Sequence, residues 1–291
     1  MSKDLEVREP VGLKKLYEIL PGFLKTRIEA IVNCGPWREY YQRFQLRHPK
    51  SVYQHDTFLV SFPRSGSTWV RFLITNVLWR GNVSHATVDG IIPDIHRRSD
   101  RELRSAPFPR VLKSHSPYNI RYPRVIYLVR DGRDVAVSYW HRKRVRGFVY
   151  DGFSDFLKRF LDGALGSCGS WQGHVLNWLE GSSRIPFLLV RYEDLKADTL
   201  GELGRIVEFL EIPHDQTVLL HAVEASSFSR MRQMEASGKP NMPTSQNGFE
   251  IRKGKVGDWR NYFSQPDEDL FWSKAGEAMR ATGYFREHVA R

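Results

Sequence analysis

Short apolar runs alternate with longer segments of helical length along the chain. Four runs have the length and the β-branched and aromatic content of buried strands, and they lie at 56–62, 110–115, 123–129 and 185–195. Helical segments are expected at 67–80, 130–144 and 199–210, the last opening with Thr199 and Glu202 at capping-box spacing. The alternation predicts an α/β fold, a single domain with a central, mostly parallel β-sheet flanked by helices.

Both ends of the chain carry signals of their own. Residues 1–55 are polar-rich, helical in character and punctuated by prolines, and we expect an N-terminal helical extension packed on the domain formed by 56–291. A last helix is expected from Pro266 to Thr282. The preceding segment 236–257 is rich in Gly, Pro, Asn and Ser, which predicts a long loop.

Polar segments directly follow the four expected strands. They are 63–68 (PRSGST), 113–115 (KSH), 130–134 (RDGRD) and 191–194 (RYED). Ligands of parallel α/β sheets bind beyond the carboxyl ends of the strands. We therefore expect these segments to converge on one ligand-binding rim.

The charge balance favours an anionic partner. The 291 residues carry a formal net charge of +11, while the hydrophobic fraction of 41% is ordinary for a globular protein and excludes wholesale disorder. Nucleic acid, an acidic membrane surface and a phosphorylated small molecule all remain candidates on charge alone.

Cysteine use and the distribution of apolar residues indicate the compartment. Cys34 and Cys168 are too few for a disulfide framework and lack metal-binding spacing. The N-terminus has no signal-peptide pattern, and no apolar stretch approaches a membrane span. We expect a cytoplasmic protein without stable membrane insertion, with 16–35 more consistent with a packing helix than with a membrane-surface helix.

The stretch SFPRSGSTWVRF (61–72) has the character of an anion-binding turn before a helix. Gly66 permits a tight turn, and Ser67 and Thr68 add hydroxyl donors at the helix start. The lysine of an ATP-binding P-loop is absent after Gly66, the positive side chain is Arg64, and no aspartate is placed to hold Mg²⁺. A metal-free phosphate or sulfate site is favoured over a nucleotide triphosphatase, with an ordinary serine-rich turn as the alternative.

Two further pairs carry candidate chemistry. Lys113 and His115 lie two residues apart on a strand, so both face the same side, where an ammonium and a proton-accepting imidazole can work together. Arg130 and Ser138 can hold a phosphate through a guanidinium and a hydroxyl. A structural histidine and a solvated charged turn are the alternatives for these pairs.

Together these motifs resemble the sulfotransferases that use 3′-phosphoadenosine 5′-phosphosulfate (PAPS), most closely the cytosolic class that acts on small molecules. The matching stretches, in the family's order, are FLVSFPRSGSTWVRF, RVLKSHSP, VIYLVRDGRDVAVSYWH and IRKGKVGDWRNYF. The resemblance implies the P-loop NTPase-like sulfotransferase fold. It also implies transfer of a sulfuryl group from PAPS, leaving 3′,5′-bisphosphoadenosine (PAP), with no metal required.

The resemblance implies a role for each matching residue. His115 would be the general base, with Lys113 and Arg64 stabilising the transferred group. The 5′-phosphosulfate would be held by Arg64, Ser65, Gly66, Ser67 and Thr68. The 3′-phosphate would be held by Arg130, Ser138, Arg252, Lys253 and Gly254. Adenine would contact Trp69, Tyr192, Ser226, Ser227, Phe228 and Met231.

Two departures and two alternatives accompany the resemblance. The family usually has lysine at Arg64, and its dimer motif is not intact in RNYFSQPDED (260–269), so the oligomeric state is left open. A nucleotide kinase or NTPase is the alternative enzyme, and a basic nucleic-acid-binding protein is the alternative outside enzymes, although we expect no nucleic-acid partner.

The acceptor is expected to be a small or lipid-like molecule, sulfated on a hydroxyl or an amine. Its pocket is expected from three segments of loop-like composition, at 82–108, 141–170 and 236–250. Their aromatic residues, which suggest a partly apolar acceptor or else belong to the core, are Phe108, Phe148, Tyr150 and Phe153.

Overall fold

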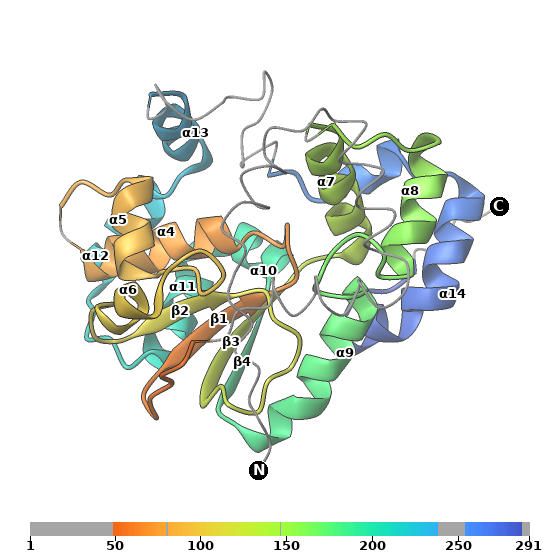
Figure 1. Cartoon of the computed structure of the whole chain (residues 1–291). Coiled ribbons are helices and arrows are strands. Elements are labelled where there is room, and N and C mark those ends of the chain that lie inside the picture. The colour runs from red at the N-terminus through yellow and green to blue at the C-terminus, as the bar shows by residue number, and fades with distance from the viewer. Residues whose placement is uncertain (1–48, 80, 146, 238–253, 287–291) are drawn as a thin grey trace, which may run out of the picture.

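Four parallel strands form the sheet at the centre of the molecule, in the order β2-β1-β3-β4 (Figure 1). They are β1 (Thr57–Ser61), β2 (Val111–Ser114), β3 (Arg124–Val129) and β4 (Phe187–Arg191). The computed structural model describes residues 49–79, 81–145, 147–237 and 254–286. The predicted α/β class and the four predicted strands are confirmed, except that the run 185–195 ends as a strand at Arg191 and continues as a helix where a turn was expected. The expected extension lies outside the described residues as far as position 48.

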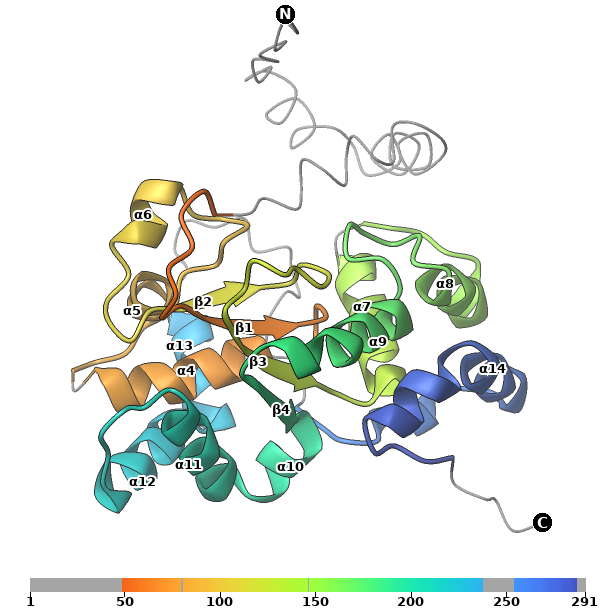
Figure 2. The same cartoon turned by 90° about the horizontal axis from the view of Figure 1, so that it is seen from below.

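Helices cover both faces of the sheet. On one side lie α4 (Ser67–Leu78), α10 (Tyr192–Ala197), α11 (Thr199–Phe209) and α12 (Gln216–Ala225). On the other side lie α7 (Gly132–Val145), α8 (Gly152–Leu161), α9 (Trp171–Gly181) and α14 (Gln265–Ala281), as Figures 1 and 2 show from two directions. The remaining elements are α5 (His85–Ile91), α6 (Asp100–Arg104), α13 (Phe228–Ser237) and the short 3-10 helices η1 (Ser182–Arg184) and η2 (Asp258–Asn261).

Strand residues alternate between two apolar cores. Phe58 and Val60 of β1 are fully buried among α7, α8, α9 and α14, and Leu59 between them is fully buried among α4, α10, α11 and α12. This is the period-two alternation of a strand whose two faces are both covered by helices. It explains why the strands read as continuous apolar runs in the sequence.

The helix predicted at 199–210 is confirmed, but its expected capping residue was wrong. Helix α11 is capped by Asp198, whose side chain accepts from the Gly201 N–H at 2.9 Å, and not by Thr199, whose hydroxyl donates to the Leu195 carbonyl. The Asp198 carboxylate, one residue before Thr199, accepts a hydrogen bond from a free N–H group of the first helical turn. This cap sets the start of the helix.

Segments expected to be loop-like also contain helices. Helices α5 and α6 lie within 82–108, and each begins with a capping box, formed by Ser84 with Thr87 and by Ser99 with Glu102. Helix α8 lies within 141–170. By contrast, the last helix α14 agrees with its prediction, since Pro266 lies in its first turn and Gly283 follows its end with a φ of 78°. Most of the loop expected at 236–257 lies outside the described residues.

Candidate active site

The carboxyl ends of the strands lie level at one edge of the sheet. Val60 lies opposite Ser114 on β2, Val129 lies opposite Arg191 on β4, and β1 also pairs in parallel with β3. The four polar segments that follow the strands therefore begin at the same edge. Their predicted convergence is confirmed by the contacts between them.

The turn after β1 lets the backbone approach its neighbours closely. Gly66 has a φ of 103°, and a Cβ atom there would lie 2.6 Å from Cδ2 of Tyr192, so only glycine fits. Gly66 is also the N-cap of α4, and no side chain caps this helix. The first N–H groups of α4 are thus left for an anion. Nearby, the fully buried Ser65 Oγ has no hydrogen-bond partner among the described residues.

Arg64 links this turn to α7. Its Nε donates to the Ser138 hydroxyl over 3.1 Å, and Ser138 is buried. The φ of Arg64 is 76°, an uncommon conformation for a residue other than glycine and one that is often found at functional sites. A direct side-chain bond therefore joins the two anion-binding motifs that the sequence indicates.

Arg130 follows β3 and is held in place from three sides. It donates to the Lys255 carbonyl oxygen at 2.9 Å, lies 3.5 Å from Asp134 Oδ2, and places its guanidinium carbon 4.5 Å from the ring centre of Tyr192. Its buried Nε has no partner among the described residues. A fixed guanidinium with a spare N–H donor suits a charge-assisted hydrogen bond to a phosphate.

Asp134 anchors the segment that supplies the Lys255 carbonyl. Its two carboxylate oxygens accept from the Gly257 N–H at 2.8 Å and from the Trp259 N–H at 2.9 Å. Burial raises the pKa of Asp134, and the charge of Arg130 opposes that rise. Asp134 thereby ties η2 to the first turn of α7, next to Arg130.

Aromatic side chains from two elements meet above the turn. Trp69 and Tyr192 pack edge to face, with their ring centroids 5.7 Å apart. The Trp69 indole N–H donates to the Ser226 carbonyl at 3.1 Å, and the Asn76 amide donates to the Ser226 hydroxyl at 3.0 Å. Because Ser226 is fully buried, its polar atoms orient Trp69 and hold the end of α12 against α4.

Phe228 and Gly254 lie near the hydroxyl end of Tyr192. The Tyr192 hydroxyl donates to the Gly254 carbonyl at 3.4 Å. Gly254 has a φ of 59°, and a Cβ atom on it would lie 3.0 Å from Phe228 Cε2. Tyr192, Phe228 and Gly254 together form a second aromatic and backbone surface at the rim. They come from a stretch that spans 62 positions of the sequence.

Of the four other predicted residues, two lie next to these contacts and two lie outside the described ranges. Met231 is buried in a small core cluster with Phe72, and Trp69 packs against this cluster. Ser227 is half-buried at the end of α12. Arg252 and Lys253 lie outside the described residues.

His115, directly after β2, has one ring nitrogen bound to the backbone. Its Nδ1 lies 2.6 Å from the Ser61 carbonyl oxygen, and because a carbonyl only accepts, Nδ1 carries the proton and Nε2 keeps its lone pair. Burial, and then the charge of Lys113, hold the pKa of His115 well below its usual value. A neutral imidazole with an accepting Nε2 is the form that a general base requires.

Lys113 has a buried carboxylate partner that the sequence motifs do not include. Its Nζ lies 2.7 Å from Asp94 Oδ2, and the two residues are 6% and 5% exposed. Burial lowers the pKa of Lys113, and the Asp94 charge opposes this. Sequence reasoning missed Asp94 and the neighbouring His96, whose only signal was an acid and a histidine in IIPDIH (91–96), ahead of the lysine.

The buried histidine His174 supports the residue after His115. His174 Nε2 lies 3.0 Å from the Ser116 carbonyl, its Nδ1 lies 2.8 Å from the Tyr127 hydroxyl, and Trp178 donates to the same carbonyl at 3.0 Å. Burial lowers the pKa of His174 to about 4. The neutral ring donates from Nε2 and accepts from Tyr127, which fixes the loop that carries His115.

A cavity of about 460 Å³ opens between the end of α7 and the start of α8, within one segment expected to build the acceptor pocket. Its lining residues are Trp140, Arg144, Gly147, Phe148, Val149, Tyr150 and Gly152. Of the four aromatic residues singled out in the sequence, Tyr150 and Phe153 pack against the core. Phe108 is 83% exposed, so it contributes little to the core.

Metal-binding and membrane-spanning features were sought throughout the described ranges. No group of three or more His, Cys, Asp and Glu side chains there is arranged to hold a metal ion. None of the helices in those ranges combines the length and apolar character needed to cross a bilayer.

Known proteins resemble this chain over most of its length. A family profile described as "Sulfotransferase domain" matches residues 54–283. Sulfotransferase 1B1 of Mus musculus is 32% identical over 251 residues, which cover 78% of this chain and 83% of the relative. Sulfotransferase 2B1 of Homo sapiens is 32% identical over 256 residues, which cover 81% of this chain and 69% of the relative.

A solved structure extends the likeness to three dimensions. The crystal structure of mouse sulfotransferase SULT7A1 complexed with PAP matches with a TM-score of 0.64 at 26% identity. The match covers 84% of this chain and 89% of that chain.

Proposed function

Because this chain belongs to the PAPS-dependent sulfotransferase family, we propose that the rim of its sheet is the active site and that a small hydroxyl-bearing molecule is its acceptor. The chain is an enzyme that transfers a sulfuryl group from PAPS to an acceptor and leaves PAP. These relatives do not favour the alternative of a nucleotide kinase or NTPase. The observation that carries the site assignment is the bond from His115 Nδ1 to the Ser61 carbonyl, which leaves Nε2 as a base at the strand ends.

The turn after β1 fits the phosphosulfate of the donor. The unpartnered Ser65 hydroxyl and the uncapped first turn of α4 offer hydrogen-bond donors, and Gly66 keeps the space that a side chain would fill. The residues assigned to this group are Arg64, Ser65, Gly66, Ser67 and Thr68.

The end of β3 and the start of α7 fit the 3′-phosphate. Arg130 offers a buried, unpartnered Nε, and the Ser138 hydroxyl lies within reach of the Arg64 side chain. Gly254 lies beside Arg130 through its neighbour Lys255. We assign Arg252, Lys253 and Gly254 to the same phosphate from the family pattern.

Adenine is proposed to bind against the aromatic residues above the turn. Trp69 and Tyr192 supply the ring surfaces, and Phe228 closes the opposite side next to Gly254. Ser226 and Ser227 at the end of α12 and the buried Met231 belong to the wall behind them, where Ser226 orients the indole of Trp69.

The proposed chemistry divides into proton transfer and charge stabilisation. PAPS supplies an activated sulfuryl group that is displaced in line by the acceptor oxygen, so that a new S–O bond forms as the bond to the 5′-phosphate breaks. His115 Nε2 takes the proton of the acceptor hydroxyl in this step. Lys113 and Arg64 stabilise the negative charge on the sulfuryl and leaving phosphate oxygens.

Arg64 fulfils this role through charge alone. Its guanidinium stays protonated in proteins, so it stabilises the leaving phosphate without donating a proton to it. Its bond to Ser138 keeps it between the two phosphate-binding motifs.

The acceptor is proposed to be partly apolar. The cavity between α7 and α8 combines Trp140, Phe148 and Tyr150 with the cation of Arg144. Such a lining suits an aromatic or alicyclic alcohol in preference to a highly charged sugar. A phenol or an alcohol also matches the proton-accepting role of His115 better than an aliphatic amine, which is itself protonated near neutral pH.

Three further expectations from the sequence stay predictions. They concern an extension over 1–55 before a domain at 56–291, a cytoplasmic location, and an oligomeric state left open by the departure from the family's dimer motif. The absence of a nucleic-acid partner is a fourth, and titration with duplex DNA and single-stranded RNA at two salt concentrations tests it.

The test of the proposed function is a transfer assay with labelled PAPS. Phenols, sterols, glycolipids and polar natural products are incubated with the full chain, and labelled products are separated from PAPS. Transfer to at least one phenol or alcohol supports the proposal. Folded protein that neither binds PAP nor labels any acceptor contradicts it.

A further inference from the structure

The segment 93–97 runs alongside β2 at the edge of the sheet. The Lys113 N–H donates to the Pro93 carbonyl at 2.9 Å, and the Ile95 N–H donates to the Lys113 carbonyl at 3.0 Å. Asp94 and Lys113 therefore form a parallel bridge outside the named strands. The segment is fixed against the strand that leads into His115.

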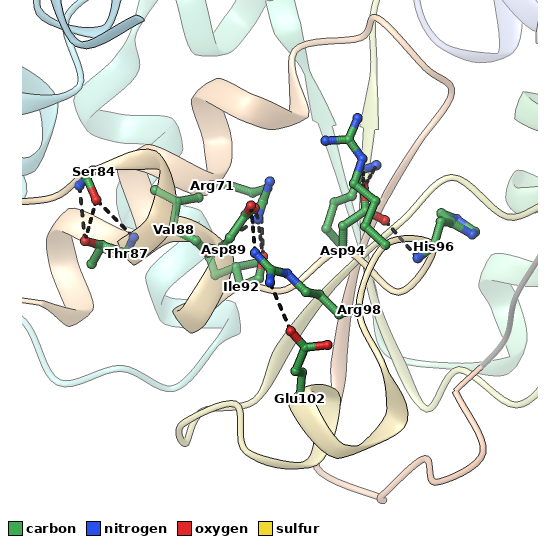
Figure 3. A network of polar contacts seen from close by, with 12 residues as sticks. Arg71, Ser84, Thr87, Val88, Asp89, Ile92, Asp94, His96, Arg98 and Glu102 are labelled. Carbon is green, nitrogen blue, oxygen red and sulfur yellow. Dashed lines mark hydrogen bonds and ion pairs between the residues drawn. The ribbon is translucent and has the colours of Figure 1, made fainter. Parts of the chain in front are cut away.

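Asp94 makes the closest side-chain contact of Lys113 that the structure describes. Its Oδ2 lies 2.7 Å from Lys113 Nζ, and its Oδ1 accepts from the His96 N–H at 3.0 Å. Figure 3 shows Asp94 and His96 linked in this way, separate from the cluster in which Asp89 lies between Arg71 and Arg98. The carboxylate thus has one oxygen for the lysine and one for its own loop.

His96 holds the backbone of His115 from the same segment. The His115 N–H donates to His96 Nε2 at 3.0 Å. The two rings are nearly parallel, with an interplanar angle of 6° and centroids 6.3 Å apart. Two residues of one loop therefore contact the two residues to which catalysis is assigned.

We propose that Asp94 and His96 are positioning residues for sulfuryl transfer, with Asp94 keeping the Lys113 ammonium charged and oriented and His96 fixing the backbone of His115. This inference rests on the roles proposed above for Lys113 and His115. Neither residue lies in the four stretches that carry the family resemblance.

The charges around Lys113 explain why its protonated form depends on a neighbouring carboxylate. Asp94 is the negative group in contact with Lys113, whereas Arg71 on α4 and Arg97 on the same loop are cations that act on it. His96, His115 and the Cys168 thiol are the other titratable groups coupled to this pair. Without the carboxylate, a buried lysine among cations favours its neutral form.

The charges of Asp94 and Lys113 act on the pKa of His115 in opposite directions. The charge of Asp94 tends to raise the pKa of His115, and the charge of Lys113 tends to lower it. Removing Asp94 is therefore expected to lower the pKa values of both residues. Both limbs of a bell-shaped pH profile then move to lower pH.

The direct test measures the titration of Lys113 itself. Protein labelled with ¹³C at the lysine ε-carbon is titrated by NMR in complex with PAP, and the Lys113 signal is identified by its loss in Lys113→Met. In Asp94→Asn we expect its apparent pKa to fall by at least about one pH unit, which reduces the charged fraction up to about tenfold. Asp162→Asn is the matched control, because it removes a carboxylate paired with another lysine, Lys274, and should leave Lys113 unchanged.

Kinetics with PAPS and 1-naphthol give the functional outcome. In Asp94→Asn we expect kcat to fall at least about tenfold more at pH 8.5 than at pH 6.5, while the KM for PAPS changes little. In the double variant Asp94→Asn/Lys113→Met the loss should be no larger than in Lys113→Met alone, because the carboxylate acts through the lysine. For His96, the Gln variant, which keeps an acceptor, should retain more activity than the Leu variant.

The outcomes separate this inference from the assignment on which it rests. If Lys113→Met keeps wild-type turnover, the proposed role of Lys113 itself is wrong. If Lys113→Met is impaired while Asp94→Asn shows an unchanged Lys113 titration, or losses that simply add to those of Lys113→Met, Asp94 has no positioning role. Melting temperatures and PAP affinities of all variants identify any that fail to fold.

Discussion

His115 Nδ1 donates to the carbonyl oxygen of Ser61 over 2.6 Å, which anchors the imidazole at the end of β2 to the backbone at the end of β1. The Ser61 hydroxyl lies 3.4 Å from the same nitrogen. Two neighbouring strand ends therefore decide which ring nitrogen carries the proton, and they leave Nε2 as the accepting atom. Because the sheet holds both partners, this orientation exists before any substrate binds.

The pH dependence of the reaction is the first expectation from this arrangement. Since burial and the Lys113 charge lower the pKa of His115, the base is expected to stay deprotonated well below pH 6.5. The acid limb of kcat/KM should then lie below that value. Initial rates with PAPS and a phenol between pH 4.5 and pH 8 measure it, and an acid limb with an apparent pKa above 7 contradicts the assignment.

The stability of the fold should fall on mild acidification because of His174. Its pKa is about 4 in the folded state against an unperturbed value of 6.5, so between these values the unfolded chain binds the proton and the folded chain does not. The stability that His174 contributes is fully present above pH 6.5 and fully lost below pH 4. From the two pKa values, His174 should account for about 2 kcal/mol of unfolding free energy lost between pH 7.5 and pH 5.

Urea unfolding of the wild type and of His174→Gln at pH 7.5 and pH 5 measures this contribution of His174 to the unfolding free energy. The glutamine variant is less stable at pH 7.5 but should show a flatter pH dependence. An equal loss in both proteins would mean that other groups dominate the acid response.

A glycine pair tests the close approach of backbone and aromatic ring at the turn. Gly66→Ala combines an unfavourable φ with a clash against Tyr192, and we expect it to lose about 1–3 kcal/mol of stability and to weaken PAP binding. Gly90→Ala is the control, since a Cβ at this helical position meets nothing within 4 Å. That change should stabilise the fold by up to about 1 kcal/mol and leave PAP affinity unchanged. Equal effects of the two substitutions on PAP binding would argue against the turn as the phosphosulfate site.

Arg130 should discriminate nucleotides by their 3′-phosphate. Loss of a charge-assisted bond of about 1.5–3 kcal/mol predicts that Arg130→Met weakens PAP binding by roughly tenfold or more. The affinity for adenosine 5′-phosphate, which lacks the 3′-phosphate, should change much less. Arg124→Met removes an arginine from the opposite end of the same strand and serves as the control. Calorimetric titrations with the two nucleotides distinguish this role from a general loss of binding, which would reduce both affinities alike.

The sequence predicted the sheet well because β1, β2 and β3 are almost wholly buried and β4 is at least partly buried, so that all four strands read as apolar runs. The convergence of the four polar segments followed from parallel pairing, and the contacts of Arg64 with Ser138 and of Gly66 with Tyr192 agree with it. What local patterns could not give was the partner of a side chain far away in the chain. Ser226 illustrates this, because its bonds to Trp69 and Asn76 span about 150 residues and depend on how α12 packs against α4.

Asp94 illustrates the same limit at the catalytic strand. The KSH motif alone predicts an available ammonium, and nothing in the spacing of residues 94 and 113 indicates that they form a bridge at the edge of β2. The helices α5 and α6 on either side of this loop were also missed, although the Ser99–Glu102 capping box was legible in the sequence. Short helices of five to seven residues lack the sustained periodicity that makes longer ones recognisable.

The most direct measurement compares sulfuryl transfer from labelled PAPS by the wild type and by His115→Asn, with PAP affinity determined for both proteins. The asparagine amide can still donate to the Ser61 carbonyl near the position of Nδ1, but it offers no base at the position of Nε2. We expect transfer to fall by at least about 100-fold while PAP affinity stays within a few-fold of the wild type. Transfer by His115→Asn at the wild-type rate, or wild-type protein that binds PAP and transfers nothing to any phenol or alcohol, would contradict the account.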